Sequence, residues 1–170
     1  MFEENVYLRS LEATDFDRVF EWHNNPELYR WLVGHFRSVD KSTERAWLES
    51  KMKTCADELN LAICRSETHA HIGNLYLRSI DAVNRHAELH LFIADPGQRS
   101  RGFGESAVRQ VLARAWDEIT LQRVYLYVLA SNEAAIRLYE KCGFTVEGTL
   151  RRHAFKQGLF VDILVMGTLN

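Results

Sequence analysis

The chain has 170 residues, of which 46% are hydrophobic and 26% are charged, a composition typical of a folded globular domain and not of a disordered segment. Its 21 Lys and Arg residues are balanced by 23 Asp and Glu residues. That balance argues against a nucleic-acid-binding protein, which normally carries a basic excess. The length fits a single domain over residues 1–170. No apolar run approaches 18 residues, so no membrane-spanning helix is expected.

The three cysteines and the first residues indicate the expected compartment. The cysteine count is odd and contains no CxxC pair, so neither a disulfide framework nor a cysteine zinc site is expected. Free thiols suit a reducing compartment. The opening residues carry Glu3 and Glu4 and no long apolar run, which is unlike a signal peptide. We therefore expect a cytoplasmic protein.

The first third of the chain predicts one strand and two main helices. The strand covers Val6–Arg9, and Thr14 is a suitable N-cap for the helix that follows. Helical spacing gives this helix an inner face of four residues: Phe16, Val19, Phe20 and His23. After a stop at Asn24-Asn25-Pro26, a short helical segment is expected over Pro26–Leu32. Another helix is expected from Thr43 to about Ala56. Three of its residues are expected to face inward: Ala46, Trp47 and Met52.

The pattern then changes to strands with short breaks, which predicts an antiparallel meander. Its three strands are Leu59–Cys64, His71–Arg78 and His86–Ala94. A helix with one apolar stripe follows over Glu105–Glu118, and then an alternating strand over Arg123–Leu129. A helix over Asn132–Lys141 ends where Gly143 can adopt a left-handed C-cap conformation. Two last strands complete the pattern: Phe144–Leu150 and Leu159–Leu169.

The resulting order, βααβββαβαββ, predicts the class of fold. It indicates a single α/β (α+β) domain. In such a domain a mixed, mainly antiparallel sheet of about seven strands is flanked by helices.

The most informative stretch is Gln98–Glu105, which follows an expected strand and opens an expected helix. Gly102 and Gly104 let the backbone approach a ligand closely, and unpaired amides at a helix N-terminus bind phosphate. Two arginines add charged, forked donors. A Walker loop is excluded because no Lys-Ser/Thr pair follows these glycines, and a dinucleotide fingerprint is disfavoured because Ala107 occupies its third glycine position. Taken alone, the stretch predicts either a phosphate site or a flexible turn.

Two separated motifs carry a family resemblance. Arg99-x-x-Gly102-x-Gly104 resembles the pyrophosphate loop of the GNAT acyltransferase superfamily, and Ser131–Phe144 resembles that superfamily's N-x-x-A-x-x-x-Y-x-x-x-G-F segment at the right spacing. Val6–Arg9 and Glu147–Arg151 resemble the branch that contains the ribosomal-protein alanine and spermidine N-acetyltransferases. The resemblance covers essentially the whole chain. It implies a GNAT-like fold and acetyl-CoA as co-substrate, and it implies no metal.

The resemblance also implies a role for individual residues. The pantetheine arm of acetyl-CoA would pair with a strand segment where adjacent strands splay apart: Phe92, Ile93 and Ala94. The pyrophosphate would bind amides along one loop: Arg99, Ser100, Arg101, Gly102, Phe103, Gly104 and Glu105. Asn132 would contact the pantetheine or its neighbouring backbone, and Tyr139 would protonate the departing CoA thiolate. A plain helix N-cap is the alternative for Asn132, and a core position is the alternative for Tyr139.

Glu88, on the strand that leads to the glycine-containing stretch, is the candidate general base. Period two places His86, Glu88 and His90 on one face of that strand. An amine must lose its ammonium proton before it attacks the thioester, and a carboxylate can accept that proton directly or through water. A solvated or cross-strand-paired face is the alternative for Glu88. A metal site formed by all three side chains is a third interpretation, for which no supporting outer ligands are identifiable.

Acceptor contacts are expected in the N-terminal helices and beside the base: Trp22, Tyr29, Trp31 and His90. Helix packing is the alternative explanation for the aromatic residues. The charged residues between Asn24 and Arg37 do not form the acidic wall that a polycationic polyamine would need. The final strand pair carries a basic rim that suits an anionic portion of an acceptor, or is simply a solvated hairpin: Arg151, Arg152, His153 and Lys156.

The favoured hypothesis is an acetyl-CoA-dependent N-acetyltransferase whose acceptor is a protein N-terminus or a small-molecule amine. Nucleotide-linked amino sugars, polyamines and aminoglycosides are alternative acceptors. A non-catalytic acyl-CoA sensor and an interaction module on the same fold are alternative functions, and Tyr139 and Glu88 count against the sensor. Cys142 is interpreted as a small buried residue and not as a nucleophile. The final strand pair makes a homodimer compatible with the sequence.

Overall fold

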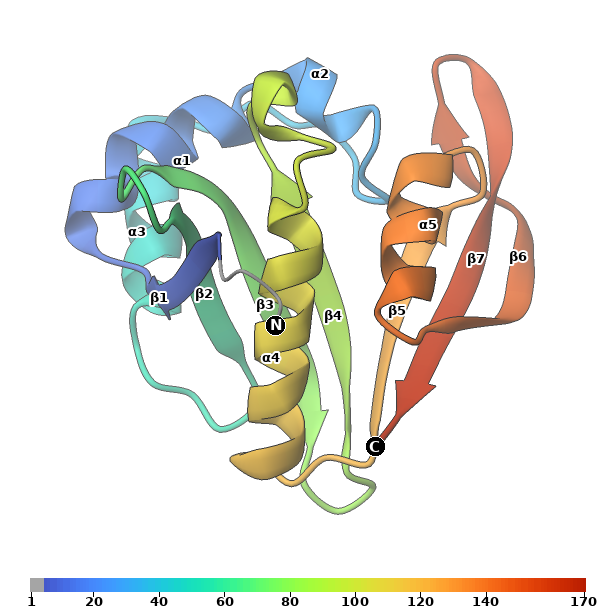
Figure 1. Ribbon diagram of the computed structural model, residues 1–170. Coiled ribbons are helices and arrows are strands. Elements are labelled where there is room, and N and C mark those ends of the chain that lie inside the picture. Colours follow the sequence, from blue (N-terminus) through green and yellow to red (C-terminus); the bar gives the residue numbers. More distant parts are fainter. Residues whose placement is uncertain (1–4) are drawn as a thin grey trace.

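The computed structural model describes residues 5–170 and is built around one seven-stranded sheet (Figure 1). Glu3 and Glu4, which bear on the signal-peptide prediction, lie outside the described residues. The strands are β1 (Val6–Ser10), β2 (Leu59–Arg65), β3 (His71–Asp81), β4 (His86–Ile93), β5 (Arg123–Leu129), β6 (Thr145–Lys156) and β7 (Leu159–Leu169). Their order across the sheet is β1-β2-β3-β4-β5-β7-β6. The expected mixed, mainly antiparallel sheet is thus confirmed.

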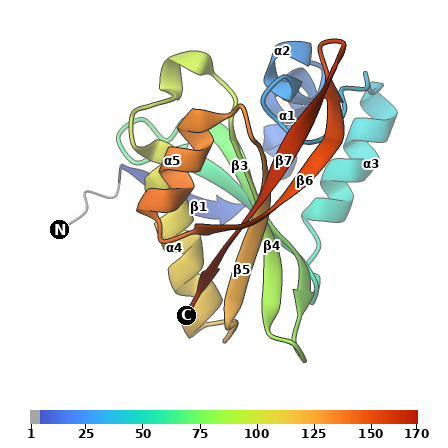
Figure 2. The ribbon, with the colours of Figure 1, turned by 90° about the vertical axis from the view of Figure 1, so that its right-hand side faces the viewer.

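Helices cover both faces of this sheet (Figures 1 and 2). They are α1 (Phe16–His23), α2 (Pro26–Tyr29), α3 (Lys41–Lys51), α4 (Phe103–Asp117) and α5 (Glu133–Lys141), with 3₁₀ turns η1 (Ala13–Asp15) and η2 (Pro96–Gln98). The helices α4 and α5 lie on one face, and α1 to α3 lie on the other. Three α-helices precede β2, one more than the expected order counts. None of the helices in residues 5–170 has the length and apolar character that a membrane crossing requires.

The pairing of β4 with β5 determines where a site can form. The strands β2, β3 and β4 make the expected antiparallel meander. The strands β4 and β5 are parallel and pair at only three positions, the last of which joins Glu88 to Tyr125. Beyond Glu88 the two strands part, as Figure 1 shows. The edge of β4 that faces β5 therefore has no strand partner over residues 89–93.

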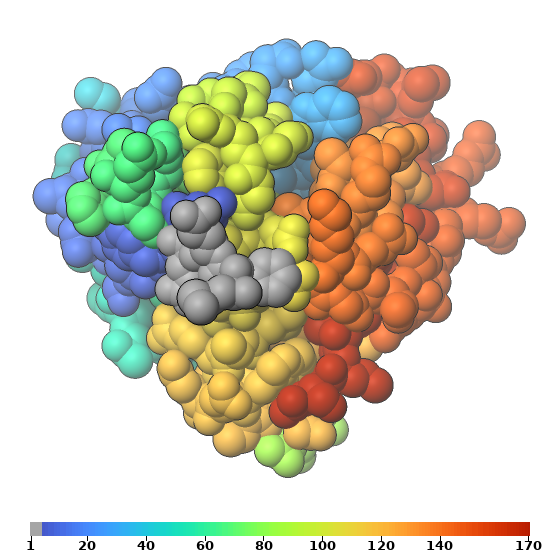
Figure 3. Space-filling model, viewed as in Figure 1, coloured from blue at the N-terminus to red at the C-terminus, as the bar shows by residue number. Residues whose placement is uncertain are grey.

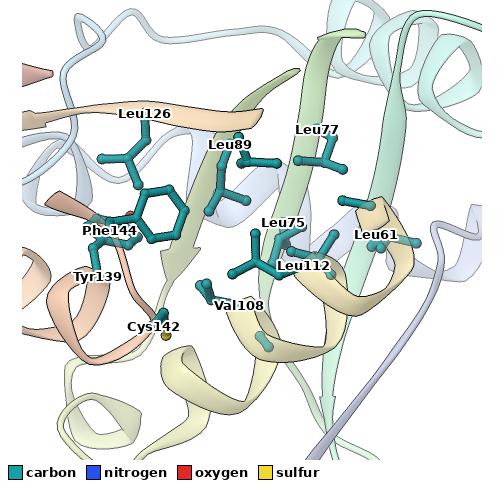
Figure 4. Close-up of a cluster of buried hydrophobic side chains, with 14 of the residues drawn as sticks. Leu61, Leu75, Leu77, Leu89, Val108, Leu112, Leu126, Tyr139, Cys142 and Phe144 are labelled. Atoms are coloured by element: carbon teal, nitrogen blue, oxygen red, sulfur yellow. The ribbon is translucent and has the colours of Figure 1, made fainter. Parts of the chain in front are cut away.

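The main hydrophobic core lies between the sheet and the helices α4 and α5. The expected stripe of α4 is buried at four positions and half-buried at Ile119; the buried four are Val108, Val111, Leu112 and Ala115. Figure 4 shows Val108 and Leu112 packed toward leucines of β3 and β4, with Tyr139 and Phe144 beside Leu126 of β5. This packing fixes α5 next to the gap between β4 and β5.

The start of α1 corrects the sequence prediction. Thr14 is not the N-cap, because Glu12 and Asp15 form a capping box around the short turn η1, in which Asp15 Oδ2 accepts from the Glu12 N–H at 2.9 Å. The helix then begins at Phe16. Its buried residues are Phe16, Val19 and Trp22, whereas Phe20 and His23, expected on the inner face, are only half-buried.

The helix α3 also differs from its prediction. It begins two residues earlier than expected because the Asp40 side chain caps it, accepting from the N–H groups of Ser42 and Thr43 at 2.9 Å. It ends at Lys51 and not near Ala56. The earlier start accompanies a different inner face. Ala46 and Met52 are exposed, Trp47 is half-buried, and Glu44 and Leu48 are buried.

Other boundaries also differ from the predicted ones. The helix α4 begins at Phe103, directly after Gly102 with its φ of +79°. The helix α2 ends at Tyr29, and β6 continues to Lys156, six residues beyond its expected end. Gly143 has a φ of +90°, which confirms the predicted left-handed C-cap of α5.

Candidate active site

A cleft of about 1050 Å³ opens where β4 and β5 part. The glycine loop, defined here as residues 98–105, and the helix α5 line one half, and α2, α3 and β3 line the other. Figure 3 shows a hollow between the glycine loop and α5. The cleft thus joins segments that are far apart in the sequence.

The glycine loop presents unused backbone donors to this cleft. Ser100 and Gly102 both have positive φ, 57° and 79°, so the chain curls before α4 begins. Within residues 5–170, no hydrogen bond uses the backbone N–H groups of residues 100–105. These groups lie at the N-terminus of a 15-residue helix, where the helix dipole favours an anion. The loop therefore fits a pyrophosphate.

Side chains fasten the glycine loop in place. Arg99 Nε donates to the Ile93 carbonyl at 3.0 Å, and its Nη2 donates to the Ala94 carbonyl at 3.2 Å, which ties the loop to the end of β4. A β-carbon at Gly104 would lie 2.6 Å from Leu138 Cδ1 of α5, so a larger residue would displace the Leu138 side chain. The Arg99 side chain thus binds backbone carbonyls and stabilises the conformation of the loop.

Most of the expected donor residues line the cleft, but three do not. Those that do are Phe92, Ile93, Arg99, Ser100, Gly102, Gly104, Glu105 and Asn132. The Phe103 side chain is buried in the main core, and Ala94 is buried against Val19 and Leu28. The Arg101 guanidinium lies 5.7 Å from the Phe103 ring centroid. Only the backbone of Arg101 and Phe103 remains available for the amide role that the resemblance implies.

Tyr139 lines the cleft from α5 and is also part of the core. Its ring lies 5.7 Å from that of Phe144, and within residues 5–170 its hydroxyl has no hydrogen-bond partner. Burial raises the pKa of Tyr139 well above its ordinary value, so the hydroxyl keeps its proton. Burial also raises the pKa of Cys142 to about 11, which keeps this thiol protonated and unsuited to nucleophilic attack.

Glu88 lies at the last paired position of β4 and β5 and lines the cleft. Its Oε1 is 2.9 Å from His90 Nε2, and its side chain is 20% exposed. His86 does not join this pair: its ring packs edge-on against Tyr125, and its Nε2 is 4.0 Å from Asp81 Oδ2. Residues 5–170 contain no group of three His, Cys, Asp or Glu side chains able to hold a metal ion. The arrangement suits proton transfer by a partly exposed carboxylate.

Three of the four expected acceptor contacts line the opposite half of the cleft: Tyr29, Trp31 and His90. Trp22 does not, because it is buried and packs edge-on against His71 and Phe92 at 4.7 and 5.8 Å between ring centroids. Helix packing, the alternative explanation for the aromatic residues, accounts for its position.

The half of the cleft opposite the glycine loop also contains residues that sequence reasoning missed: His23, Glu44, Tyr76, Arg78 and Tyr127. Glu44 is only 2% exposed, and both of its carboxylate oxygens lie within 3.0 Å of His23 Nδ1. Alternation along β3 puts Tyr76 and Arg78 on one face, which could have been predicted from the sequence. The strand register that places this face beside β4 could not have been predicted.

The tip of the hairpin of β6 and β7 lies near α2 (Figure 2), although no residue of the hairpin lines the cleft. Lys156 Nζ donates to the carbonyls of Tyr29 and Gly34 at 3.1 and 2.6 Å, and burial lowers the pKa of this amine. The rest of the expected basic rim is exposed: Arg151, Arg152 and His153. One of the four basic residues is therefore a structural tether.

Asn132 joins the two halves of the cleft and is predicted to stabilise the fold. Its Oδ1 accepts from the Ala135 N–H and its Nδ2 donates to the Trp31 carbonyl, both at 3.3 Å. Asn132→Ala should lower the free energy of unfolding by about 1 kcal/mol, measured by urea titration. Asn132→Asp retains the cap acceptor and should lose less. Equal losses in the two variants would contradict a capping role.

Comparison with known proteins identifies similar N-acetyltransferases. A family model described as the acetyltransferase (GNAT) domain matches residues 5–145. The chain is 29% identical over 164 residues to the spermidine N(1)-acetyltransferase of Vibrio cholerae, covering 96% of this chain and 92% of that protein. It is 23% identical to an L-amino acid N-acetyltransferase of Escherichia coli, covering 97% and 98%.

Solved structures share the same fold. A crystal structure of the Vibrio cholerae spermidine N-acetyltransferase in complex with CoA and spermine matches with a TM-score of 0.89 at 24% identity, covering 98% of this chain and 96% of that one. The overall fold of the chain is thus the fold of a known structure. The family match over residues 5–145 establishes that the chain belongs to the acetyltransferase (GNAT) family, whose acyl donor is acetyl-CoA.

Proposed function

We propose that the protein transfers the acetyl group of acetyl-CoA to a primary amine by direct attack of the amine on the thioester. The observation that carries this proposal is the cleft between β4 and β5. One cavity is lined by a protonated tyrosine, a partly exposed carboxylate and a loop with unused backbone donors.

The donor half fits the parts of acetyl-CoA in turn. The unpaired edge of β4 over residues 89–93 offers backbone groups to the amides of the pantetheine arm. The N–H groups of residues 100–105 offer donors to the pyrophosphate. Asn132 lies beside this path and holds the start of α5.

Two side chains handle the protons. Glu88 accepts the proton of the ammonium group, directly or through one water, which frees the nitrogen lone pair. As the nitrogen–carbon bond forms and the carbon–sulfur bond breaks, Tyr139 gives its proton to the sulfur. The nitrogen's second proton then passes to the Tyr139 phenolate, and Glu88 releases its proton to solvent. No covalent bond to the protein is required, which agrees with the protonated state of Cys142.

Related proteins suggest classes of acceptor without choosing between them. The relatives reported above are named for spermidine and for L-amino acids. A non-catalytic sensor would need neither Tyr139 nor Glu88, and an interaction module would need no loop shaped for a pyrophosphate. Self-association belongs to the same proposal, because β6 is an outer strand and a solved structure of the Vibrio cholerae enzyme is dodecameric.

The first experiment is a calorimetric titration of the protein with acetyl-CoA, with thermal unfolding alongside. At 100 times its dissociation constant, the ligand should stabilise the folded state by about 2.7 kcal/mol. Gly102→Asp should weaken binding by roughly 100-fold or more, because it puts a negative charge among the phosphate-binding amides. The variant also forces a side chain into a positive-φ position.

Gly148→Asp is the matched control for this variant. It makes the same chemical change on β6, where a β-carbon has nothing within 4 Å and φ is not positive, so acetyl-CoA affinity should be unchanged. Absence of binding to the folded wild-type protein would contradict the proposed function.

A further inference from the structure

We infer that the acceptor is a small amine that also carries a carboxylate, such as a free amino acid, and that Arg78 binds this carboxylate next to Glu88. The inference rests on the proposed function of the same cleft and specifies its substrate class.

Arg78 differs from the other arginines of the cleft because, within residues 5–170, only the Tyr76 ring contacts its guanidinium and no hydrogen bond or ion pair holds it. Arg99 donates to two backbone carbonyls, and Arg137 Nη1 donates to Glu133 at 3.0 Å. Within residues 5–170 the guanidinium of Arg78 makes no hydrogen bond and no ion pair, and its Nε is buried without a partner. A cation with unused donors at the wall of a cleft is suited to an anion from outside the chain.

The sheet places this cation beside the candidate base. Arg78 and Glu88 are direct partners in the register of β3 and β4, which sets their β-carbons about 4.5–5.5 Å apart on one face. No ion pair joins them, because Glu88 is turned to His90 at 2.9 Å. A positive and a negative group thus line the cleft side by side, each able to receive the opposite charge of a substrate.

Tyr76 gives the guanidinium its orientation. The ring centroid of this buried tyrosine lies 4.8 Å from Arg78 Cζ, a contact in which a planar guanidinium stacks on an aromatic ring. The Tyr76 hydroxyl is itself held by Asn74 Nδ2 at 2.8 Å. The ring is therefore held in place and restricts the position of the guanidinium, whose planar fork of donors suits a bidentate carboxylate contact.

The same charges disfavour the other acceptor classes. A polyamine has no anionic group and would bring a second cation against Arg78. A peptide N-terminus has an amide where a free amino acid has its carboxylate. The buried carboxylate of Glu44 does not offer a free cation site, because both of its oxygens contact His23. An amino acid satisfies both groups at once, with its ammonium at Glu88 and its carboxylate at Arg78.

The test compares acceptors that differ only in the carboxylate. Free amino acids, their amides and their decarboxylated amines are assayed with acetyl-CoA, beside spermidine and short peptides, by release of the CoA thiol. The highest kcat/KM should belong to a free amino acid, at least tenfold above its amide and its decarboxylated amine, since both of these lack the charged group that Arg78 would bind.

Variants identify the residue responsible. Arg78→Gln should lower kcat/KM for the amino acid by tenfold or more and leave acetyl-CoA affinity unchanged. The kcat/KM for the free amino acid should then be close to that for its amide. Arg78→Lys should restore part of the preference for the free amino acid. Arg114→Gln, on the exposed face of α4 and outside the cleft, is the control. Unfolding curves show whether each variant is folded at the assay temperature.

Two failures are distinguishable. If the folded protein binds no acetyl-CoA, the proposed function fails. If acetyl-CoA binds and a carboxylate-free amine or a peptide is the best acceptor, or if Arg78→Gln keeps the ratio of acid to amide, only the inference about the carboxylate is overturned.

Discussion

Replacing Tyr139 by phenylalanine should lower kcat by roughly 100-fold to 10,000-fold, the range for loss of a positioned general acid. The substitution removes only the hydroxyl, which has no partner within residues 5–170, so stability should change little. Because burial raises the pKa of Tyr139 above its ordinary value near 10, the protonated, active form persists throughout the neutral and mildly alkaline range. Loss of this acid should not reduce the rate below about pH 10.

The measurement is steady-state release of the CoA thiol, with acetyl-CoA affinity measured separately by calorimetry. Tyr7→Phe is a matched control, since Tyr7 lies on β1 with its hydroxyl at 3.2 Å from His69 and does not line the cleft. A Tyr139→Phe variant that retained kcat within threefold of wild type would assign Tyr139 to the core alone.

Glu88→Gln should lower kcat by roughly 100-fold or more for an ordinary alkylamine, because glutamine cannot accept the ammonium proton. The loss should be much smaller for a weakly basic acceptor, such as an alkoxyamine, that is already neutral at the assay pH. Parallel measurements of kcat with the two acceptors separate proton removal from a structural role.

The contact between Glu88 and His90 supplies the control for that experiment. His90→Gln removes the imidazole that lies 2.9 Å from Glu88 and leaves the carboxylate in place. Its loss should be smaller than that of Glu88→Gln and similar for both acceptors. A Glu88→Gln defect that is equally large for the neutral amine would show that Glu88 positions other groups and does not take the proton.

Local signals in the sequence were sufficient for most of the fold. Clean alternation along β5 and the stripe of α4 reflect periodic burial, which a single segment reveals by itself. The N-cap before α1 was harder to predict. Thr14 and Asp15 are both acceptable N-caps by residue type, and the choice between them depends on the capping box with Glu12. The inner face of α3 was predicted wrongly because burial of Glu44 requires His23 from another helix.

The candidate site, like the fold, was predictable only where local sequence patterns determine it. The glycine loop and Tyr139 lie within contiguous motifs, so their place in the chain was predictable from their spacing. The role that we infer for Arg78 was not predictable, because its position opposite Glu88 depends on strand register, and its lack of an ion pair depends on where the Glu88 side chain turns. Residues that are brought together only by the fold form no contiguous motif in the sequence, so they cannot be predicted from it.

The tether made by Lys156 has a consequence for how the protein is made. This lysine donates to the carbonyls of Tyr29 and Gly34, from which it is separated by 127 and 122 positions in the chain. Residues 98–105 and the helices around them are synthesised well before Lys156. The strand β5, however, forms one side of the cleft and pairs on its other edge with β7, which follows Lys156 in the chain. The nascent chain should therefore complete the whole cleft only when its last strand is in place.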